Sequence, residues 1–83
     1  MKMIKVLICD DDRDNLDILR LLMEYEGFDV IKEIDSVKLI EKIIEHNPDL
    51  LLVDIVRPTL SGEEIIGKIR SDSTLKNLPI IAF

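Results

Sequence analysis

The sequence predicts an α/β fold built on an open, doubly wound parallel sheet, with the element order βαβαβαβ. Short runs rich in β-branched and other apolar residues alternate with longer runs whose apolar residues recur at helical spacing. The run Leu50–Val53 is apolar at every position, which is typical of a central parallel strand buried on both faces. Strands and helices that alternate in this way favour right-handed crossovers, so that helices cover both faces of the sheet.

The four predicted strands are expected to differ in burial. The first, Ile4–Cys9, is almost wholly apolar, which indicates a strand inside the sheet. The second, Phe28–Ile34, carries Asp29 and Lys32, and these charges indicate a partly exposed edge strand. The two remaining strands are predicted at Asp49–Val53 and Leu78–Phe83.

Three helices are predicted between the strands, because apolar residues recur there every three or four positions. Their expected ranges are Asp12–Glu26, Val37–Glu45 and Ser61–Arg70. The residues expected to face the sheet are Leu16, Leu19, Leu22 and Met23 in the first helix, Val37, Ile40 and Ile44 in the second, and Ile65, Ile66 and Ile69 in the third.

Residues suited to helix ends stand at the expected boundaries. Asp12 is expected to cap the start of the first helix, and Gly27 to follow its last turn. Asp35 or Ser36 would cap the second helix. Ser61, with a glutamate three residues further on, matches a capping box for the third helix.

Length, charge and composition exclude several classes of protein. Eighty-three residues allow one small domain, and a net charge of −6 argues against binding to nucleic acids or anionic membranes. Apolar runs such as Leu50–Val53 are too short to span a membrane, and the N-terminus lacks the features of a signal peptide, so a cytoplasmic location is expected. The single cysteine, Cys9, excludes an intrachain disulfide.

Acidic residues follow two of the predicted strands at their carboxyl ends. Asp10 and Asp11 come directly after the first strand, and Asp54 directly after the third. In a doubly wound sheet these two ends lie side by side, where ligands of this fold class bind. Clustered carboxylates repel one another, and Mg²⁺, which prefers oxygen ligands, would offset that repulsion. A carboxylate beside the metal is also suited to attack a phosphoryl group.

Two runs and the C-terminal segment resemble the receiver domains of two-component response regulators. The runs are Val6–Asp12 and Leu51–Gly62, and the C-terminal segment is Leu78–Ala82. The resemblance covers the whole chain, and the motifs occur in the family's order and spacing. It implies a flavodoxin-like or receiver-like sheet whose four strands have the spatial order 2-1-3-4.

The resemblance also implies a role for each matching residue. Asp54 would accept a phosphoryl group from a phosphohistidine on a sensor histidine kinase, so the chain would assist its own phosphorylation without being a dedicated enzyme. Asp11 and Asp54 would bind Mg²⁺ directly, and Asp10 through water or by positioning the metal. The backbone carbonyl of Val56 would complete the protein ligands. The residues that would shape the loop into the third helix are Pro58, Ser61 and Gly62.

The sequence departs from the family pattern at three places. Arg57 stands where methionine is common; it would pair with Asp54, contact a phosphoryl oxygen or point to solvent. Ser61 replaces a frequent aspartate but still suits a helix cap. The chain, 1–83, also stops before the family's Ser/Thr, before the fifth strand with its lysine and before the last helices. We therefore expect a truncated receiver that self-associates through an exposed apolar fourth strand, exchanges segments or is weakly stable.

Other interpretations of the acidic residues are less well supported. A truncated or pseudo-receiver that binds or dimerises without phosphorylation remains the main alternative. An EF-hand is excluded because Asn15 stands where glycine is required. A haloacid-dehalogenase-like phosphatase would fit Asp10 and Asp12, but Asp14 stands where threonine or valine is usual. His46, in the last turn of a helix, is better suited to contact carbonyl groups than to transfer phosphate.

Overall fold

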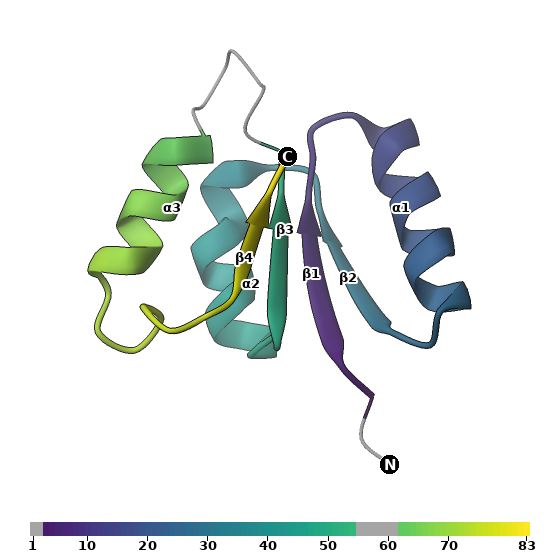
Figure 1. Cartoon of the computed structure of the whole chain (residues 1–83). Coiled ribbons are helices and arrows are strands. Elements are labelled where there is room, and N and C mark those ends of the chain that lie inside the picture. Colours follow the sequence, from purple (N-terminus) through teal and green to yellow (C-terminus); the bar gives the residue numbers. More distant parts are fainter. Residues whose placement is uncertain (1–2, 55–61) are drawn as a thin grey trace.

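Four parallel strands form one sheet in the order β2-β1-β3-β4 in the computed structural model, which describes residues 3–54 and 62–83 (Figure 1). The predicted element order and strand order are both confirmed. The strands are β1 (Lys5–Cys9), β2 (Asp29–Glu33), β3 (Leu50–Val53) and β4 (Ile80–Ala82); the helices are α1 (Arg13–Tyr25), α2 (Leu39–His46) and α3 (Gly62–Ser71), and a short 3₁₀ helix, η1 (Ser36–Lys38), precedes α2.

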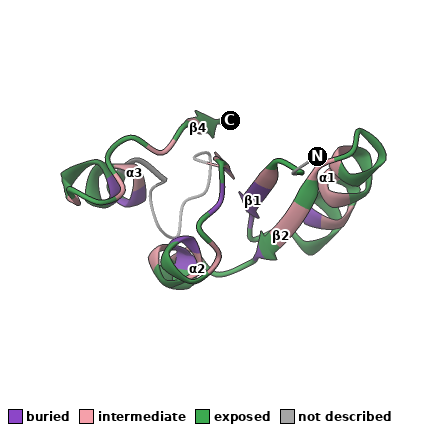
Figure 2. Cartoon of the chain, turned by 90° about the horizontal axis from the view of Figure 1, so that it is seen from below, coloured by how far each residue is buried: buried purple, intermediate pink, exposed green. Residues whose placement is uncertain are grey.

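Helices cover both faces of the sheet, as the alternating pattern predicts. Figure 2 shows α1 on one face and α2 with α3 on the other. The side chains of each strand alternate between these faces. On the α2/α3 face the buried cluster consists of Leu7, Cys9, Leu39, Ile43, Leu51, Val53, Ile65 and Ile69, and on the α1 face it consists of Val6, Ile8 and Leu16.

Helix α1 begins and ends at the residues that the sequence predicts. The Asp12 side chain accepts hydrogen bonds from the backbone N–H groups of Asp14 and Asn15, so it is the N-cap. Gly27 follows the helix with a φ of 95°, a conformation that favours glycine because it has no Cβ. These two ends fix the length of α1 between β1 and β2.

The expected inward face of α1 is wrong at one position. Leu16 is buried, and Leu19 and Met23 pack beside it against the sheet, whereas the Leu22 side chain is 60% exposed. Seven residues complete nearly two helical turns, so Met23 lies directly above Leu16. Leu22 is one position earlier and is therefore rotated away from the sheet.

The expected inward face of the second helix is wrong at two of its three positions. Leu39 and Ile43, four residues apart, are buried against the sheet, and Ile40 packs partly beside them. Val37 is 74% exposed because it lies in η1 before α2 begins, and Ile44 is 64% exposed. Ile44 follows Ile43 by one residue, which turns it about 100° around the helix axis. Asp35, one of the two predicted caps, accepts a hydrogen bond from the Val37 N–H and caps η1.

The predicted interior of the third helix is confirmed. Ile65 and Ile69 are buried and Ile66 packs against the same cluster. The Arg70 Nη1 atom donates to the carbonyl oxygens of Lys76 (2.6 Å) and Leu78 (2.8 Å), which ties the segment before β4 to the end of α3. The expected Ser61 cap lies outside the described residues.

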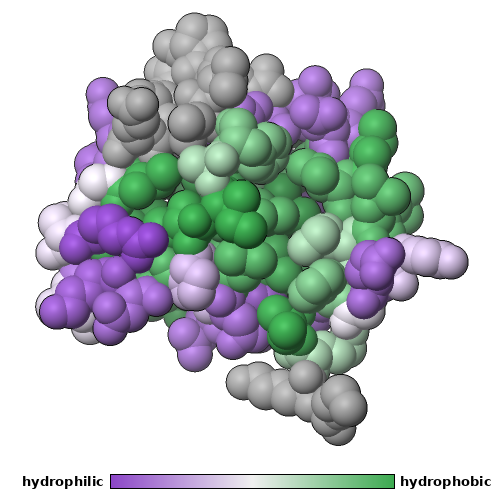
Figure 3. Space-filling model, viewed as in Figure 1, coloured by the Kyte–Doolittle hydropathy of each residue, from purple (hydrophilic) through white to green (hydrophobic). Residues whose placement is uncertain are grey.

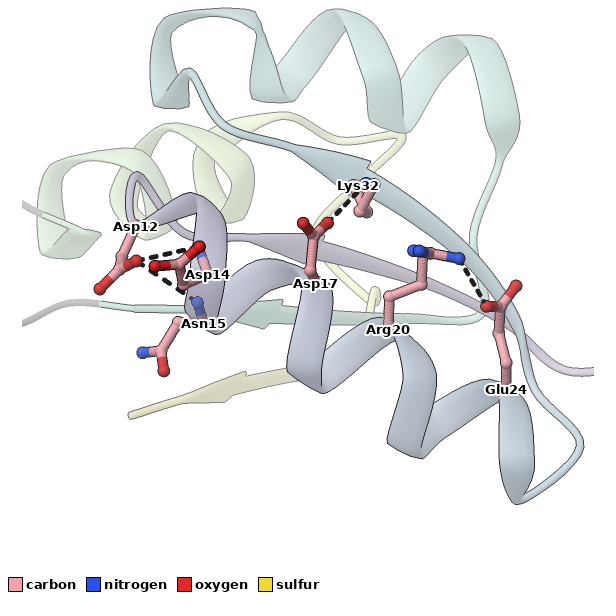
Figure 4. A network of polar contacts seen from close by, with 7 residues as sticks. All are labelled: Asp12, Asp14, Asn15, Asp17, Arg20, Glu24 and Lys32. Atoms are coloured by element: carbon pink, nitrogen blue, oxygen red, sulfur yellow. Dashed lines mark hydrogen bonds and ion pairs between the residues drawn. The ribbon is translucent and has the colours of Figure 1, made fainter.

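Ion pairs on the surface connect α1 to itself and to β2. Lys32 Nζ lies 2.9 Å from Asp17 Oδ1, and Arg20 Nη1 lies 2.9 Å from Glu24 Oε1, one helical turn further on (Figure 4). The hydrogen bond from Lys32 holds the pKa of the Asp17 carboxyl below its ordinary value. Because all four side chains are accessible to water, these ion pairs add little to the free energy of folding. The pair of Lys32 and Asp17 nevertheless links β2 to α1.

Candidate functional site

Asp10 and Asp54 extend neighbouring strands at the same edge of the sheet. Cys9 pairs in register with Val53, and the Asp54 N–H donates to the Cys9 carbonyl oxygen at 3.1 Å. The next residue of each chain segment is therefore an aspartate. Since adjacent strands lie roughly 5 Å apart, the two residues follow the carboxyl ends of β1 and β3 side by side.

Asp10 is a buried carboxylate held by the first turn of α1. Only 1% of this residue is exposed. One carboxylate oxygen, Oδ1, accepts from the Asp12 N–H at 3.0 Å, and the other, Oδ2, accepts from Asn15 Nδ2 at 3.3 Å. A buried carboxylate needs such donors to replace lost hydration, and here they come from the segment that leads into α1.

The other acidic residues of this edge are more accessible. Asp11 and Asp12 are exposed and Asp54 is half-buried. Asp12 serves as the cap of α1 and turns its carboxylate toward the Asp14 and Asn15 backbone, as Figure 4 shows. The helix-capping role expected for Asp12 is therefore confirmed.

A further buried acid at this edge, Glu33, was missed in the sequence. It ends β2, pairs in register with Cys9 and is only 7% exposed. Its carbonyl oxygen accepts from the Asp10 N–H at 3.3 Å, and its Oε2 accepts from the Asp35 N–H at 2.9 Å. The available signal was its position, since Glu33 stands at the carboxyl end of its strand, and Asp10 and Asp54 stand one residue beyond the ends of theirs.

Burial and the neighbouring acids keep the Cys9 thiol in its neutral form. Burial first, and then the negative charges of Glu33 and Asp10, together raise the pKa of Cys9 from 9.0 to about 12. Cys9 packs in the cluster on the α2/α3 face. It is a core residue, as its position in a buried strand predicts.

The chemistry of the acidic edge fits Mg²⁺, which favours carboxylate and carbonyl oxygens together with retained water. Asp10, Asp11 and Asp54 supply oxygens of this kind. Within the described residues no group of three or more His, Cys, Asp or Glu side chains is arranged to hold a metal ion. Mg²⁺ usually binds only one or two carboxylates and keeps several water ligands, so the carboxylates at this edge are sufficient for a Mg²⁺ site.

Several predicted site residues lie in the segment that the structure leaves undescribed. They are Val56, Arg57, Pro58 and Ser61, while Gly62 is the first residue of α3. His46 ends α2, where its carbonyl oxygen accepts from Lys5 Nζ at 3.1 Å. His46 therefore lies at the opposite ends of β1 and β3 from the acidic edge.

The fold and this edge together define an α/β domain with acidic residues at the carboxyl ends of its inner strands. Comparison with known proteins identifies the family: residues 6–83 match the model of the response regulator receiver domain. The chain belongs to this family, and it is a receiver domain of two-component signalling. The resemblance drawn from the sequence is thus confirmed.

Similar proteins support this assignment. The polar-differentiation response regulator DivK of Brucella ovis is 34% identical over 77 residues, which cover 93% of this chain and 63% of that protein; the DivK protein of Brucella suis gives the same values. The chain thus spans less than two thirds of these relatives. The chemotaxis response regulator CheY4 of Vibrio cholerae has a TM-score of 0.89 at 25% identity, covering 98% of this chain and 68% of that one. A putative response regulator from Chloroflexus aurantiacus has a TM-score of 0.90 at 27% identity, covering 98% and 66%.

None of the helices in the described parts of the chain has the length and apolar composition needed to cross a bilayer.

Proposed function

We propose that Asp54 accepts a phosphoryl group from a phosphohistidine of a sensor histidine kinase, in a reaction that depends on Mg²⁺. The observation that carries the proposal is the register of β1 and β3, in which Asp10 and Asp54 follow paired residues at one edge of the sheet. Membership of the receiver family supports the same role. We expect this exchange to take place in the cytoplasm.

The proposed step is nucleophilic substitution at phosphorus. A carboxylate oxygen of Asp54 forms a bond to phosphorus while the bond between phosphorus and the imidazole nitrogen of the donor breaks. The electron pair of the broken bond stays on the imidazole, which takes a proton from solvent. The product on this chain is an acyl phosphate, a mixed anhydride, so the charge at position 54 changes from one negative charge to two.

Three carboxylates beside an incoming phosphoryl group repel it. We propose that Asp11 and Asp54, with the backbone carbonyl of Val56, hold Mg²⁺ and that Asp10 positions it. Bound Mg²⁺ would shield the negative charges of the phosphoryl oxygens. Arg57 is proposed as a further contact to a phosphoryl oxygen, because a guanidinium pairs readily with phosphate. The chain thereby assists its own phosphorylation and turns over no separate substrate.

Intact mass spectrometry tests this proposal. The chain is incubated with Mg²⁺ and acetyl phosphate, beside an Asp54→Asn control and a sample containing excess EDTA. We expect one added phosphoryl group in the parent with Mg²⁺ and none in either control. Equal labelling of Asp54→Asn would locate the acceptor elsewhere, and no labelling of a parent that binds Mg²⁺ would favour a receiver that acts by binding alone.

We also propose a second function, in which the chain acts as a binding module without being phosphorylated and self-associates through β4. The observation that favours it is the open edge of this strand. Within residues 3–54 and 62–83, β4 pairs only with β3 and has an open edge. Ile81 is 53% exposed and Phe83 is 42% exposed. An apolar open edge favours pairing with another strand.

A further inference from the structure

We infer that Asn15 is a positioning residue: its side-chain amide holds the buried carboxylate of Asp10 in place and thereby raises the affinity of the acidic edge for Mg²⁺. The inference rests on the proposed function, because it concerns the same edge of the sheet. It adds a residue from α1 to a site whose other members follow strands.

The contacts of Asp10 are divided between its two carboxylate oxygens. The Asp12 N–H donates to Oδ1 at 3.0 Å, and Asn15 Nδ2 donates to Oδ2 at 3.3 Å. With 1% exposure Asp10 has little contact with bulk water, so each of these donors contributes to keeping the carboxylate in one orientation. The amide of Asn15 acts on the oxygen that the Asp12 peptide does not contact.

The position of Asn15 explains how an exposed residue reaches a buried one. Its backbone N–H donates to Asp12 Oδ1 at 3.3 Å as part of the helix cap, which fixes its place in the first turn of α1. Its side chain then extends back to the end of β1. The segment between β1 and α1 is thus fixed by two sets of hydrogen bonds. The Asp12 carboxylate caps the helix, and the Asn15 amide binds the carboxylate of Asp10 at the end of the strand.

Asparagine suits this position because of the charges around it. Asp11, Asp12 and Asp14 stand in the same short segment of the chain, so an acidic residue at position 15 would add repulsion. A lysine would place a competing cation beside the metal. Asparagine supplies N–H donors without any net charge.

Hydrogen bonds that orient a metal-binding side chain typically change metal affinity 10- to 100-fold. The bond here is 3.3 Å long and comes from an exposed residue, which favours the lower end of that range. We therefore expect loss of the amide to weaken Mg²⁺ binding on the order of tenfold.

Calorimetric titration with Mg²⁺ alone tests the inference in the parent, Asn15→Leu and Asn15→Gln. Leucine has nearly the size of asparagine but no donor, and glutamine keeps the amide. Both have higher helix propensity than asparagine, so neither weakens helix α1 itself. We expect a Kd about tenfold higher for Asn15→Leu, and a Kd closer to that of the parent for Asn15→Gln. A purely structural role would lower the thermal midpoint of Asn15→Leu and leave its Kd for Mg²⁺ unchanged.

A measurement without metal separates this inference from the proposed function. In the parent, the side-chain amide protons of Asn15 should exchange with solvent more slowly than those of the exposed Asn47 and Asn77, as followed by NMR. Equal exchange rates, or an unchanged Mg²⁺ affinity in Asn15→Leu, would overturn the inference alone. A parent that binds no Mg²⁺ would overturn the proposed function and the inference with it.

Discussion

Burial and the neighbouring acidic edge act together on the thiol of Cys9. The Cys9 thiol is 4% exposed, and burial together with the nearby charges of Glu33 and Asp10 raises its pKa to about 12. Reaction with thiol reagents requires the thiolate. At pH 8 the folded protein therefore keeps Cys9 neutral and inaccessible.

We predict that Ellman's reagent does not label the native chain at pH 8 and labels it fully in urea. Because the pKa of Cys9 is raised above the unfolded value, the stability contributed by this group is complete below about pH 9 and is lost as the pH rises toward 12. Urea titrations at pH 8 and pH 10.5 should show a smaller loss of stability in Cys9→Ala than in the parent. Rapid labelling under native conditions would contradict this prediction.

At the scale of residues, the sequence predicted the acids that follow β1 and β3 but missed Glu33. A run of aspartates after an apolar strand indicates a site, whereas a single glutamate at the end of a partly polar strand resembles a solvated residue. Its burial depends on the pairing of β2 with β1 and on the turn to Asp35, whose backbone N–H donates to the buried Glu33 carboxylate. Contacts of this kind depend on tertiary structure, as does the hydrogen bond from Asn15 to Asp10.

At the scale of elements, two glycines have opposite roles. Gly27 has a φ of 95° at the end of α1, and Gly67 lies within α3; a Cβ on either would meet no atom within 4 Å. Sterics with neighbours therefore do not decide the effect of a substitution. The backbone conformation alone does.

We predict that Gly67→Ala raises the free energy of unfolding by roughly 0.5 to 1 kcal/mol, because alanine is the better helix former. Gly27→Ala should lower it by about 1 kcal/mol or more, because a side chain is strained at positive φ. Urea denaturation followed by circular dichroism measures both. Effects of the same sign would show that the conformation of one of these positions differs from the one described.

The two faces of α1 allow a comparison within one helix. Leu16 is 3% exposed and packs on Val6 and Ile8, whereas Leu22 is 60% exposed. We predict that Leu16→Ala lowers the free energy of unfolding by about 2 to 4 kcal/mol. Leu22→Ala should change it by less than about 0.5 kcal/mol. Equal losses in urea denaturation would mean that Leu22 is covered in solution.

The rotational position of the helices was the least predictable part of the fold. Periodicity located α1 and α2, but each contains more apolar residues than its inward face can accommodate. Ile44 extends the apolar pattern of Leu39, Ile40 and Ile43, and only the contact with the sheet distinguishes the buried residues from the exposed ones. In α3 the apolar residues were few enough to define one face, and the prediction held.

At the scale of the whole molecule, the two faces of the sheet are covered unequally. Helices α2 and α3 cover one face, while α1 alone packs on the other (Figure 2). Figure 3 shows apolar side chains gathered over the sheet on the face viewed in Figure 1. The covering of both faces followed from the alternation of elements, and the strand order followed from the resemblance to receiver domains, whereas the extent of this apolar surface depends on packing.

The open edge of β4 leads to a prediction about assembly. If this edge pairs with a second copy, light scattering at rising protein concentration should show a shift from monomer to dimer. Ile81→Lys places a charge on the edge strand and should keep the chain monomeric. Ile18→Lys is the matched control, since Ile18 is 56% exposed and Ile81 is 53% exposed, but Ile18 lies on α1. Dimerisation lost in both variants would show that the contact involves α1 and is not confined to the edge of β4. A parent that stays monomeric at every concentration would rule out pairing through β4.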